Sequence, residues 1–292
     1  MKGSPKFYVL GLLFAAVWSS ASVAAKLGFR SVQPLVLYQF RFSFAALALL
    51  ILAYSLKSRE LPKGKEWLQL AIFGFFNVAL ALGLFAFAIK EVAAGIGALQ
   101  VGVNPLVISV FSAIVAGRRI KLNEMMALFF GILGVAIAVF PLLQDSYATP
   151  KGLFLLSLST LSYSTAAVYF SKVKWRLKKL TINAWQAFFG ALFLFPASFI
   201  FYKGGLNVYD LNFFLSGSWL AIPVSAGAVY LWLWLLSLDT VKASFFLFLC
   251  PIFGFIYAYF ILGEPFTLYT LTGLLVVMLA LYIGQKKSKP KN

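Results

Sequence analysis

Apolar residues form ten long blocks along this chain, separated by short connectors that hold most of the charged residues. Each block has about 20 apolar residues, enough for a helix to cross the roughly 30 Å hydrocarbon core of a bilayer. The blocks are too long and too uniformly apolar for the alternating strands of a membrane barrel. We therefore predict ten membrane-spanning helices, at residues 7–25, 34–55, 69–89, 93–116, 124–143, 152–171, 182–202, 217–237, 241–262 and 265–284.

The composition places the chain in lipid rather than in water. Hydrophobic residues make up 62% of its 292 residues and charged residues 11%, whereas soluble domains have about 45–50% and 25%. A soluble fold has too little interior to bury so much apolar surface. We predict an all-α integral membrane protein of the cell membrane, plasma or inner, with the lipid bilayer as its first partner.

The positive charges indicate the orientation of the predicted helices. Alternate connectors, termini included, hold 19 lysines and arginines in one set and 5 in the other. Cytoplasmic connectors carry the excess of positive charge, so both termini should be cytoplasmic. This bias also explains the net charge of +17 without a nucleic-acid partner, which we do not expect.

A shift of 146 positions aligns one half of the chain with the other. The shift places Pro105 on Pro251 and Gly117 on Gly263, and four further identities follow: Leu122 on Leu268, Leu128 on Leu274, Leu133 on Leu279 and Ile137 on Ile283. Each half has five predicted helices, and an odd number makes the second copy enter the membrane from the opposite side. We predict two inverted five-helix repeats, at residues 1–143 and 144–292, the second with a basic cytoplasmic tail.

Residues that carry chemistry are scarce. The chain has no histidine and one cysteine, Cys250, which lies inside an apolar block. No metal site, disulfide or catalytic constellation is visible, and no pair of carboxylates lies inside the spans. We expect no metal, no cofactor and no enzymatic activity. The alternatives to a transporter are a channel or a non-catalytic membrane scaffold, with an intramembrane enzyme the weakest.

Short motifs at both ends of the chain resemble a known family. The segment from Trp18 to Lys26, followed by Pro34 and the pair Arg41-Phe42, is similar to the opening of an EamA-type domain of the drug/metabolite transporter superfamily. Pro251, then Gly263-Glu264-Pro265 and Gly273, resemble the close of that domain, and the first repeat departs from it with Arg118 where the second has Glu264. The resemblance implies two such domains and a ten-helix exporter or permease of metabolites.

We therefore predict a secondary transporter that moves small metabolites, with amino acids or other amphipathic organic compounds as candidates, by alternating access. The sequence names neither the substrate, the direction of transport nor the oligomeric state. Polar and aromatic side chains inside the spans are the candidates for a substrate cavity: Trp18, Ser19, Ser22, Gln39, Arg41, Asn77, Gln100, Asn104, Tyr163, Trp185, Gln186, Tyr230 and Trp234.

Two features of this set have alternative interpretations. Arg41 is the only charged residue well inside a span. In one interpretation it is a counter-charge for an anionic substrate. In the other it has a structural role, in which it reaches the membrane interface or bonds helix-end carbonyls. Gln100 and Asn104 share one helical face and either line a cavity or join helices by hydrogen bonds. Pro105 and Pro251 are candidate helix breaks at equivalent positions.

All eight acidic residues lie at span ends or in connectors. Proton-driven carriers commonly relay protons through acids or histidines inside the membrane. We therefore predict facilitated diffusion or exchange.

Overall fold

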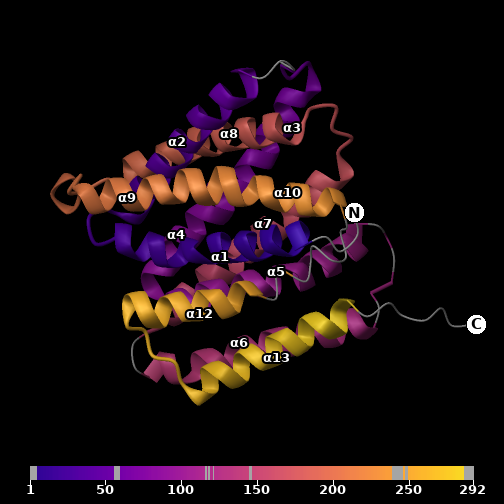
Figure 1. Cartoon of the computed structure of the whole chain (residues 1–292), viewed down its shortest axis with the longest axis vertical. Helices are drawn as coiled ribbons and strands as arrows, with labels where there is room; N and C mark the ends of the chain where they lie inside the picture. The colour runs from indigo at the N-terminus through magenta and orange to yellow at the C-terminus, as the bar shows by residue number, and fades with distance from the viewer. Residues whose placement is uncertain are drawn as a thin grey trace, which may run out of the picture.

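Helices make up nearly all of the computed structural model, which describes residues 5–55, 60–115, 117, 119–120, 122–144, 147–238, 246 and 249–285 (Figure 1). Within those ranges no strand occurs, and one isolated bridge joins Val92 and Ala148. The first half contains α1 (Pro5–Gly28), α2 (Pro34–Ser55), α3 (Lys65–Gly74), the π-helix η1 (Phe75–Leu80), α4 (Ala81–Glu91), α5 (Ala94–Val115) and α6 (Leu122–Gln144). The second contains α7 (Pro150–Lys172), α8 (Lys179–Ile200), the 3₁₀ turn η2 (Gly204–Leu206), α9 (Leu211–Trp219), the π-helix η3 (Leu220–Ala228), α10 (Val229–Leu238), α12 (Leu249–Leu262) and α13 (Leu268–Gln285).

The outer surface of this bundle is apolar. Phe260 is 78% exposed, Leu268 75% and Phe199 74%, a degree of exposure that soluble proteins avoid over large patches. Within the described residues, eight helices are long and apolar enough to cross a membrane, counting α3 to α4 and α9 into α10 as single spans, while α12 and α13 are shorter apolar helices. The chain is thus a multi-pass membrane protein. Most of residues 241–248, the start of the ninth predicted span, lies outside the described residues.

Corresponding elements of the two halves recur at the predicted spacing. The bounds of α8 are those of α2 moved by 145 positions, and the π-helices begin at Phe75 and Leu220, again 145 apart. The chain turns after α5 at Gly117 and after α12 at Gly263, 146 positions later, and both glycines have positive φ, 63° and 67°. Such a conformation favours glycine, which explains why the repeat keeps it there.

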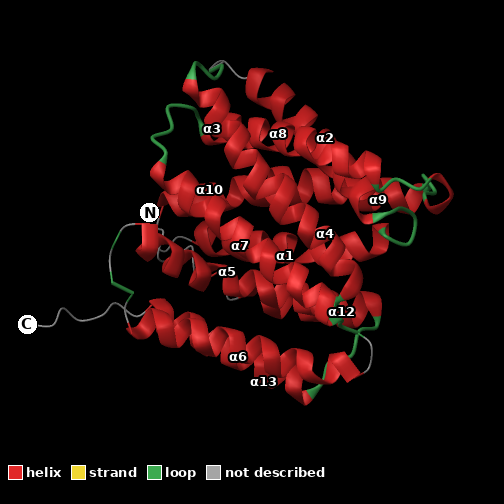
Figure 2. Cartoon of the chain, turned by 180° about the vertical axis from the view of Figure 1, so that it is seen from behind, coloured by secondary structure: helices red, strands yellow, loops and turns green. Residues whose placement is uncertain are grey.

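Three pairs of equivalent helices, α2 with α8, α5 with α12 and α6 with α13, pack against each other. α2 lies beside α8, with the Leu35 carbonyl accepting from Ser198 and the Tyr54 hydroxyl from Trp185. α6 and α13 form the most extensive pair and lie side by side at one edge of the bundle (Figures 1 and 2). A Cβ on Gly134 would lie 2.8 Å from the Gly273 carbonyl oxygen, so these two backbones touch. Small residues permit such close approach of membrane helices.

The connectors gather at two ends of the bundle (Figure 2). We name them by one residue each. The Glu264 end contains Glu264, the start of α5 and the end of α1, and it lies to the left in Figure 1; the Lys179 end contains Lys179, the end of α7 and the start of α3. The expected domain boundary at residues 143/144 falls at the end of α6 and stays a prediction.

Candidate functional site

A cavity lies in the middle of the bundle, among helices of both halves. Its larger part has a volume of about 340 Å³ and its smaller part about 60 Å³, and a few hundred Å³ is the size of a small-molecule site. The two parts adjoin, because six residues line both: Trp18, Arg41, Leu82, Val101, Asn104 and Tyr163. These shared residues come from α1, α2, α4, α5 and α7.

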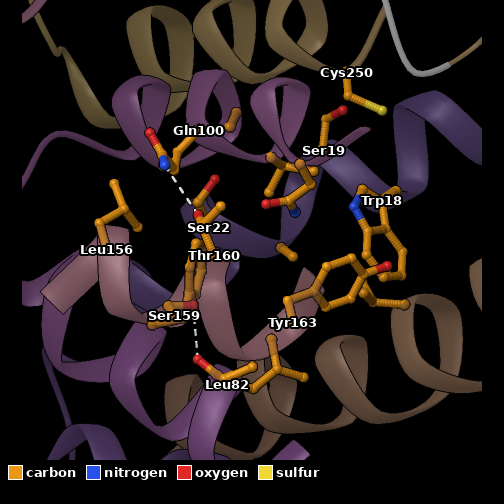
Figure 3. A pocket seen from close by; sticks show the side chains of 18 of the residues that line it. Trp18, Ser19, Ser22, Leu82, Gln100, Leu156, Ser159, Thr160, Tyr163 and Cys250 are labelled. Carbon is orange, nitrogen blue, oxygen red and sulfur yellow. Dashed lines mark hydrogen bonds between the residues drawn. The ribbon is translucent and has the colours of Figure 1, made fainter. Parts of the chain in front are cut away.

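Short polar side chains lie among apolar ones on the wall of the smaller part (Figure 3). The Gln100 amide donates to the Thr160 hydroxyl at 3.0 Å, as the dashed line in Figure 3 shows. Ser159 donates to the Ala81 carbonyl at 2.8 Å, and Ser19 donates to the Ala15 carbonyl at 2.6 Å. Most hydroxyls here are thus satisfied by the protein itself.

Arg41 lies where the two parts of the cavity meet. Its side chain is 4% exposed, and its Nε donates to the Ser225 hydroxyl at 2.9 Å. The guanidinium carbon lies 4.8 Å from the centre of the Phe42 ring and 5.2 Å from that of Tyr38, positions from which an aromatic ring attracts a cation. Among the described residues no carboxylate forms a salt bridge with Arg41.

Both π-helices contribute to the cavity wall. A π-turn leaves backbone carbonyls without their usual helical partner. In η3 the Ser225 hydroxyl donates to the Leu220 carbonyl at 2.9 Å. In η1 the Phe76 carbonyl accepts from Ser162 at 2.7 Å. Serine side chains therefore stabilise the widened turns from which Asn77 and Ser225 reach the cavity.

A chain of amides joins the two π-helices across α8. Asn77 donates to Gln186 at 2.9 Å, Gln186 donates to Asn183 at 2.7 Å, and Asn183 donates to the Ser225 carbonyl at 3.2 Å. Because Ser225 also accepts from Arg41, one polar network connects four elements. Gln186 occupies in α8 the position that Arg41 occupies in α2, 145 residues earlier.

The larger part of the cavity has an aromatic wall and extends to the Lys179 end. Phe14 stacks on Trp232 with ring centres 5.0 Å apart, and Phe73 packs on Phe170 at 5.1 Å. Lys179, an exposed residue at the start of α8, also lines this part. The cavity thus runs from Arg41 towards this end of the bundle.

At the opposite end of the bundle, charged side chains and a helix start bond to one another. The Glu264 carboxylate accepts from the backbone N–H groups of Ala94 at 2.7 Å and Gly95 at 3.2 Å, and from the Lys26 ammonium at 3.0 Å. These groups, which we call the Glu264 cluster, join α1, α5 and the link between α12 and α13. A carboxylate at a helix N-terminus satisfies its free N–H groups and complements its dipole.

Nine of the residues that the sequence singled out line the cavity: Trp18, Ser19, Ser22, Arg41, Asn77, Gln100, Asn104, Tyr163 and Gln186. Four lie elsewhere. Gln39 donates to the Ala191 carbonyl between α2 and α8, Trp185 packs on Trp67, Tyr230 is 56% exposed, and Trp234 packs in the cluster around Phe14 and Cys250.

The structure adds residues that the sequence interpretation missed. These are Phe14, Ser159, Thr160, Lys179, Asn183, Ser225 and Trp232. For Asn183 a signal existed, because it precedes Gln186 by three positions and shares its helical face. For Ser225 the signal was Pro223, whose missing N–H frees a carbonyl in the same span.

The two candidate helix breaks have different local surroundings. α5 continues as helix through position 105, so Pro105 does not interrupt it. Pro251 lies near the start of the described part of α12. A Cβ on Gly102 of α5 would lie 2.8 Å from the Pro251 ring, so this proline packs against α5. Arg118, the first-repeat counterpart of Glu264, lies outside the described residues.

A multi-pass bundle of two related halves around a central cavity is typical of membrane transporters. The chain matches the EamA-like transporter family over residues 5–140 and again over 150–283. It belongs to this family and contains its domain twice, which confirms the resemblance seen in the sequence.

Several relatives extend along most of the chain. A protein named as an uncharacterized transporter from Archaeoglobus fulgidus is 28% identical over 97% of this chain and 99% of its own. Protein PecM of Dickeya dadantii is 25% identical over 78% of this chain and 80% of its own. A solved crystal structure, 14% identical, superposes with a TM-score of 0.66 over 96% of this chain and 98% of that one. That likeness concerns the fold alone.

Proposed function

We propose that this protein is a secondary carrier of small metabolites that works by alternating access, with ten spans in two inverted repeats and the central cavity as its substrate site. The observation that carries this proposal is a cavity between the repeats that leads towards the Lys179 end, while at the other end the buried Glu264 cluster joins α1, α5 and the link between α12 and α13. A carrier has one closed end at a time, whereas an open channel has none.

The antiparallel pairing of equivalent helices supports the inverted arrangement. In α2 with α8 and in α6 with α13, each helix faces its own counterpart running in the opposite direction. A two-fold axis in the membrane plane produces such pairs, and it also allows the two ends to exchange their open and closed forms.

The charge distribution supports an orientation with both termini and the Lys179 end in the cytoplasm. The connector before α8 has five positive residues, and its neighbours at the Glu264 end have few. Cytoplasmic connectors collect positive charge. The conformation described here is then open to the cytoplasm, with the Glu264 end facing the opposite side.

Cysteine accessibility tests this proposal without knowledge of the substrate. Cys250 is the only cysteine and is 1% exposed, so Cys250→Ala gives a cysteine-free parent. Single cysteines at Ile108, in the larger part, and at Ser22, in the smaller part, are then exposed to a membrane-impermeant maleimide from either face.

We expect Ile108→Cys to react from the cytoplasmic face at least about tenfold faster than from the outside, because the outward-open state is the minor one. Ser22→Cys should react slowly from the outside, through that minor state. Equal reaction of both cysteines from both faces would indicate a channel. A complete lack of reaction at Ser22→Cys from the outside would contradict alternating access.

A further inference from the structure

The strongest chemical signal in the cavity is the positive charge of Arg41, to which the described residues supply no counter-ion. Arginine has five N–H donors and stays charged at neutral pH. Of these donors, the one on Nε binds Ser225, and a further one faces the neutral Tyr38 hydroxyl, so no described partner of the guanidinium carries a negative charge. Burying a cation without an ionic partner costs free energy. A ligand with a negative charge here would offset that cost and bind with a more favourable free energy than a neutral ligand.

Acidic residues are missing from the cavity wall. Among the described residues that line either part, none is Asp or Glu. The wall holds a second cation, Lys179, at the end through which the cavity opens, where a positive charge raises the local concentration of anions. The cavity therefore attracts negative charge. A cation would find aromatic faces and neutral oxygens there, among them Asn104 Oδ1, which has no hydrogen-bond partner among the described residues, but no carboxylate to neutralise it.

The two repeats differ at the equivalent position, and this difference gives the site a direction. Gln186 in α8 is neutral. Its amide oxygen accepts a hydrogen bond from Asn77, and its amide nitrogen donates one to Asn183. Arg41 in α2 is charged and has donors to spare. An acid group should therefore lie on the Arg41 side of the cavity.

The remaining wall fits an apolar body. Phe14, Trp18 and Trp232 form one aromatic group, and Phe73 with Phe170 forms another. Aromatic side chains bind flat apolar groups by stacking and by exclusion of water. A volume of about 340 Å³ is enough for one ring with a short chain.

We infer that the substrate is a small organic anion, with its acid group on Arg41 and an apolar, preferably aromatic, body against the Trp18 wall. This inference rests on the proposed carrier function and names its substrate class. Arg41 then has a binding role in addition to its contact with Ser225 of the π-helix η3.

Three probes that share one carbon skeleton but differ in charge test this selectivity. They are 3-phenylpropionate, 3-phenylpropionamide and 3-phenylpropylamine, which present an anion, a neutral amide and a cation on the same phenylpropyl skeleton. Binding to the purified full chain in nanodiscs is measured by titration calorimetry, together with uptake of each probe by proteoliposomes. We expect the acid to bind about tenfold or more tightly than the amide, and the amine to bind no better than the amide.

Variants at Arg41 separate binding from a purely structural role. Arg41→Gln reproduces the residue of the other repeat, and it should bring acid and amide to equal affinity without weakening the amide. Arg41→Lys keeps the charge and should keep most of the preference. The matched control is Arg30→Gln, the same change at an exposed residue outside the cavity wall, which should leave the preference intact.

The outcomes distinguish this inference from the carrier function. Equal binding and uptake of all three probes, or preference for the amine, would overturn the anion selectivity and leave the carrier standing. A preference for the acid that survives in folded Arg41→Gln would also overturn the role of Arg41, as would the absence of any binding by the acid at millimolar concentration. Failure of the carrier itself would appear in the cysteine accessibility, which uses none of these probes.

Discussion

The two ends of the bundle are held together by charges of very different burial. At the Glu264 end, Glu264 is 7% and Lys26 24% exposed, and the same carboxylate also binds two helix N–H groups. At the Lys179 end, Arg176, which bonds Glu66 at 2.9 Å, is 48% exposed. Hydrogen bonds to buried charged groups contribute about 1.5–3 kcal/mol each, whereas exposed ion pairs contribute about 0–1 kcal/mol. The comparison teaches that one carboxylate can decide which end is closed.

Neutralising this carboxylate should have the largest effect. Glu264→Gln removes the charge that Lys26 and the start of α5 share, so we expect Ser22→Cys to react from the outside about tenfold faster or more, as the outward-open state gains about 1.4 kcal/mol or more. The reaction rate with an impermeant maleimide measures the shift.

The same end provides a matched control. Glu91 also bonds a lysine there, Lys151, but that lysine is 72% exposed. Glu91→Gln should therefore change the rate at Ser22→Cys less than about twofold, as expected for an exposed ion pair. Equal effects of the two variants would show that burial does not distinguish them.

In the middle of the cavity, the Ser225 hydroxyl joins Arg41 of α2 to the π-helix η3. Ser225→Ala leaves the Arg41 Nε–H and the Leu220 carbonyl without their shared hydroxyl. We expect the apparent unfolding temperature in nanodiscs to fall by about 4 °C or more, since unsatisfied buried groups cost about 1–3 kcal/mol each.

Ser157→Ala serves as the reference for Ser225→Ala. Its hydroxyl donates to the Leu153 carbonyl at 2.9 Å on an exposed face of α7, and without the hydroxyl that carbonyl keeps its usual helical N–H partner. The unfolding temperature of this variant should stay within about 1 °C of the parent. A similar loss in both variants would argue against a special role for the π-helix contact.

The smallest effect is expected at an exposed residue of the Glu264 end. Asp210 has a pKa below its ordinary value of 3.8, because the Phe213 N–H and then the Ser31 hydroxyl hydrogen-bond its carboxylate. A depressed pKa in the folded state gives stability that is present above the unfolded pKa and is lost as the pH falls through the folded one.

Asp210→Asn should therefore lower the unfolding temperature slightly, by roughly 1 °C near pH 6, since asparagine still caps α9. The difference from the parent should shrink as the pH falls below about 4. A difference that grows towards acid would reverse the assigned sign.

Much of the fold follows from the apolar pattern alone. The predicted span 34–55 has the bounds of α2, and the predicted span 152–171 lies within α7. Length and hydropathy determine such segments, because a bilayer requires about 20 apolar residues per helix. The pattern does not reveal η1 and η3, since a π-turn depends on which side chain satisfies the freed carbonyl, as Ser225 and Ser162 do here.

The cavity was harder to predict than the helices. In a helix that is apolar on all sides no polar face indicates which side points inward, so Tyr230 was chosen although Trp232, two residues on, lines the cavity. Lone polar residues such as Asn77 and Gln100 were better guides, because lipid penalises polar groups. Gln39 shows the limit of that rule, since a helix interface also satisfies an amide.

Distances between spin labels test alternating access most directly. One pair, at Arg30 and Phe266, spans the Glu264 cluster, and the other, at Ile114 and Lys178, spans the mouth at the Lys179 end; all four positions are exposed. Electron paramagnetic resonance compares the parent with Glu264→Gln. The account predicts opposite changes, with the Arg30–Phe266 distance lengthening while the Ile114–Lys178 distance shortens. The account would be contradicted if both distances changed in the same direction or if neither changed.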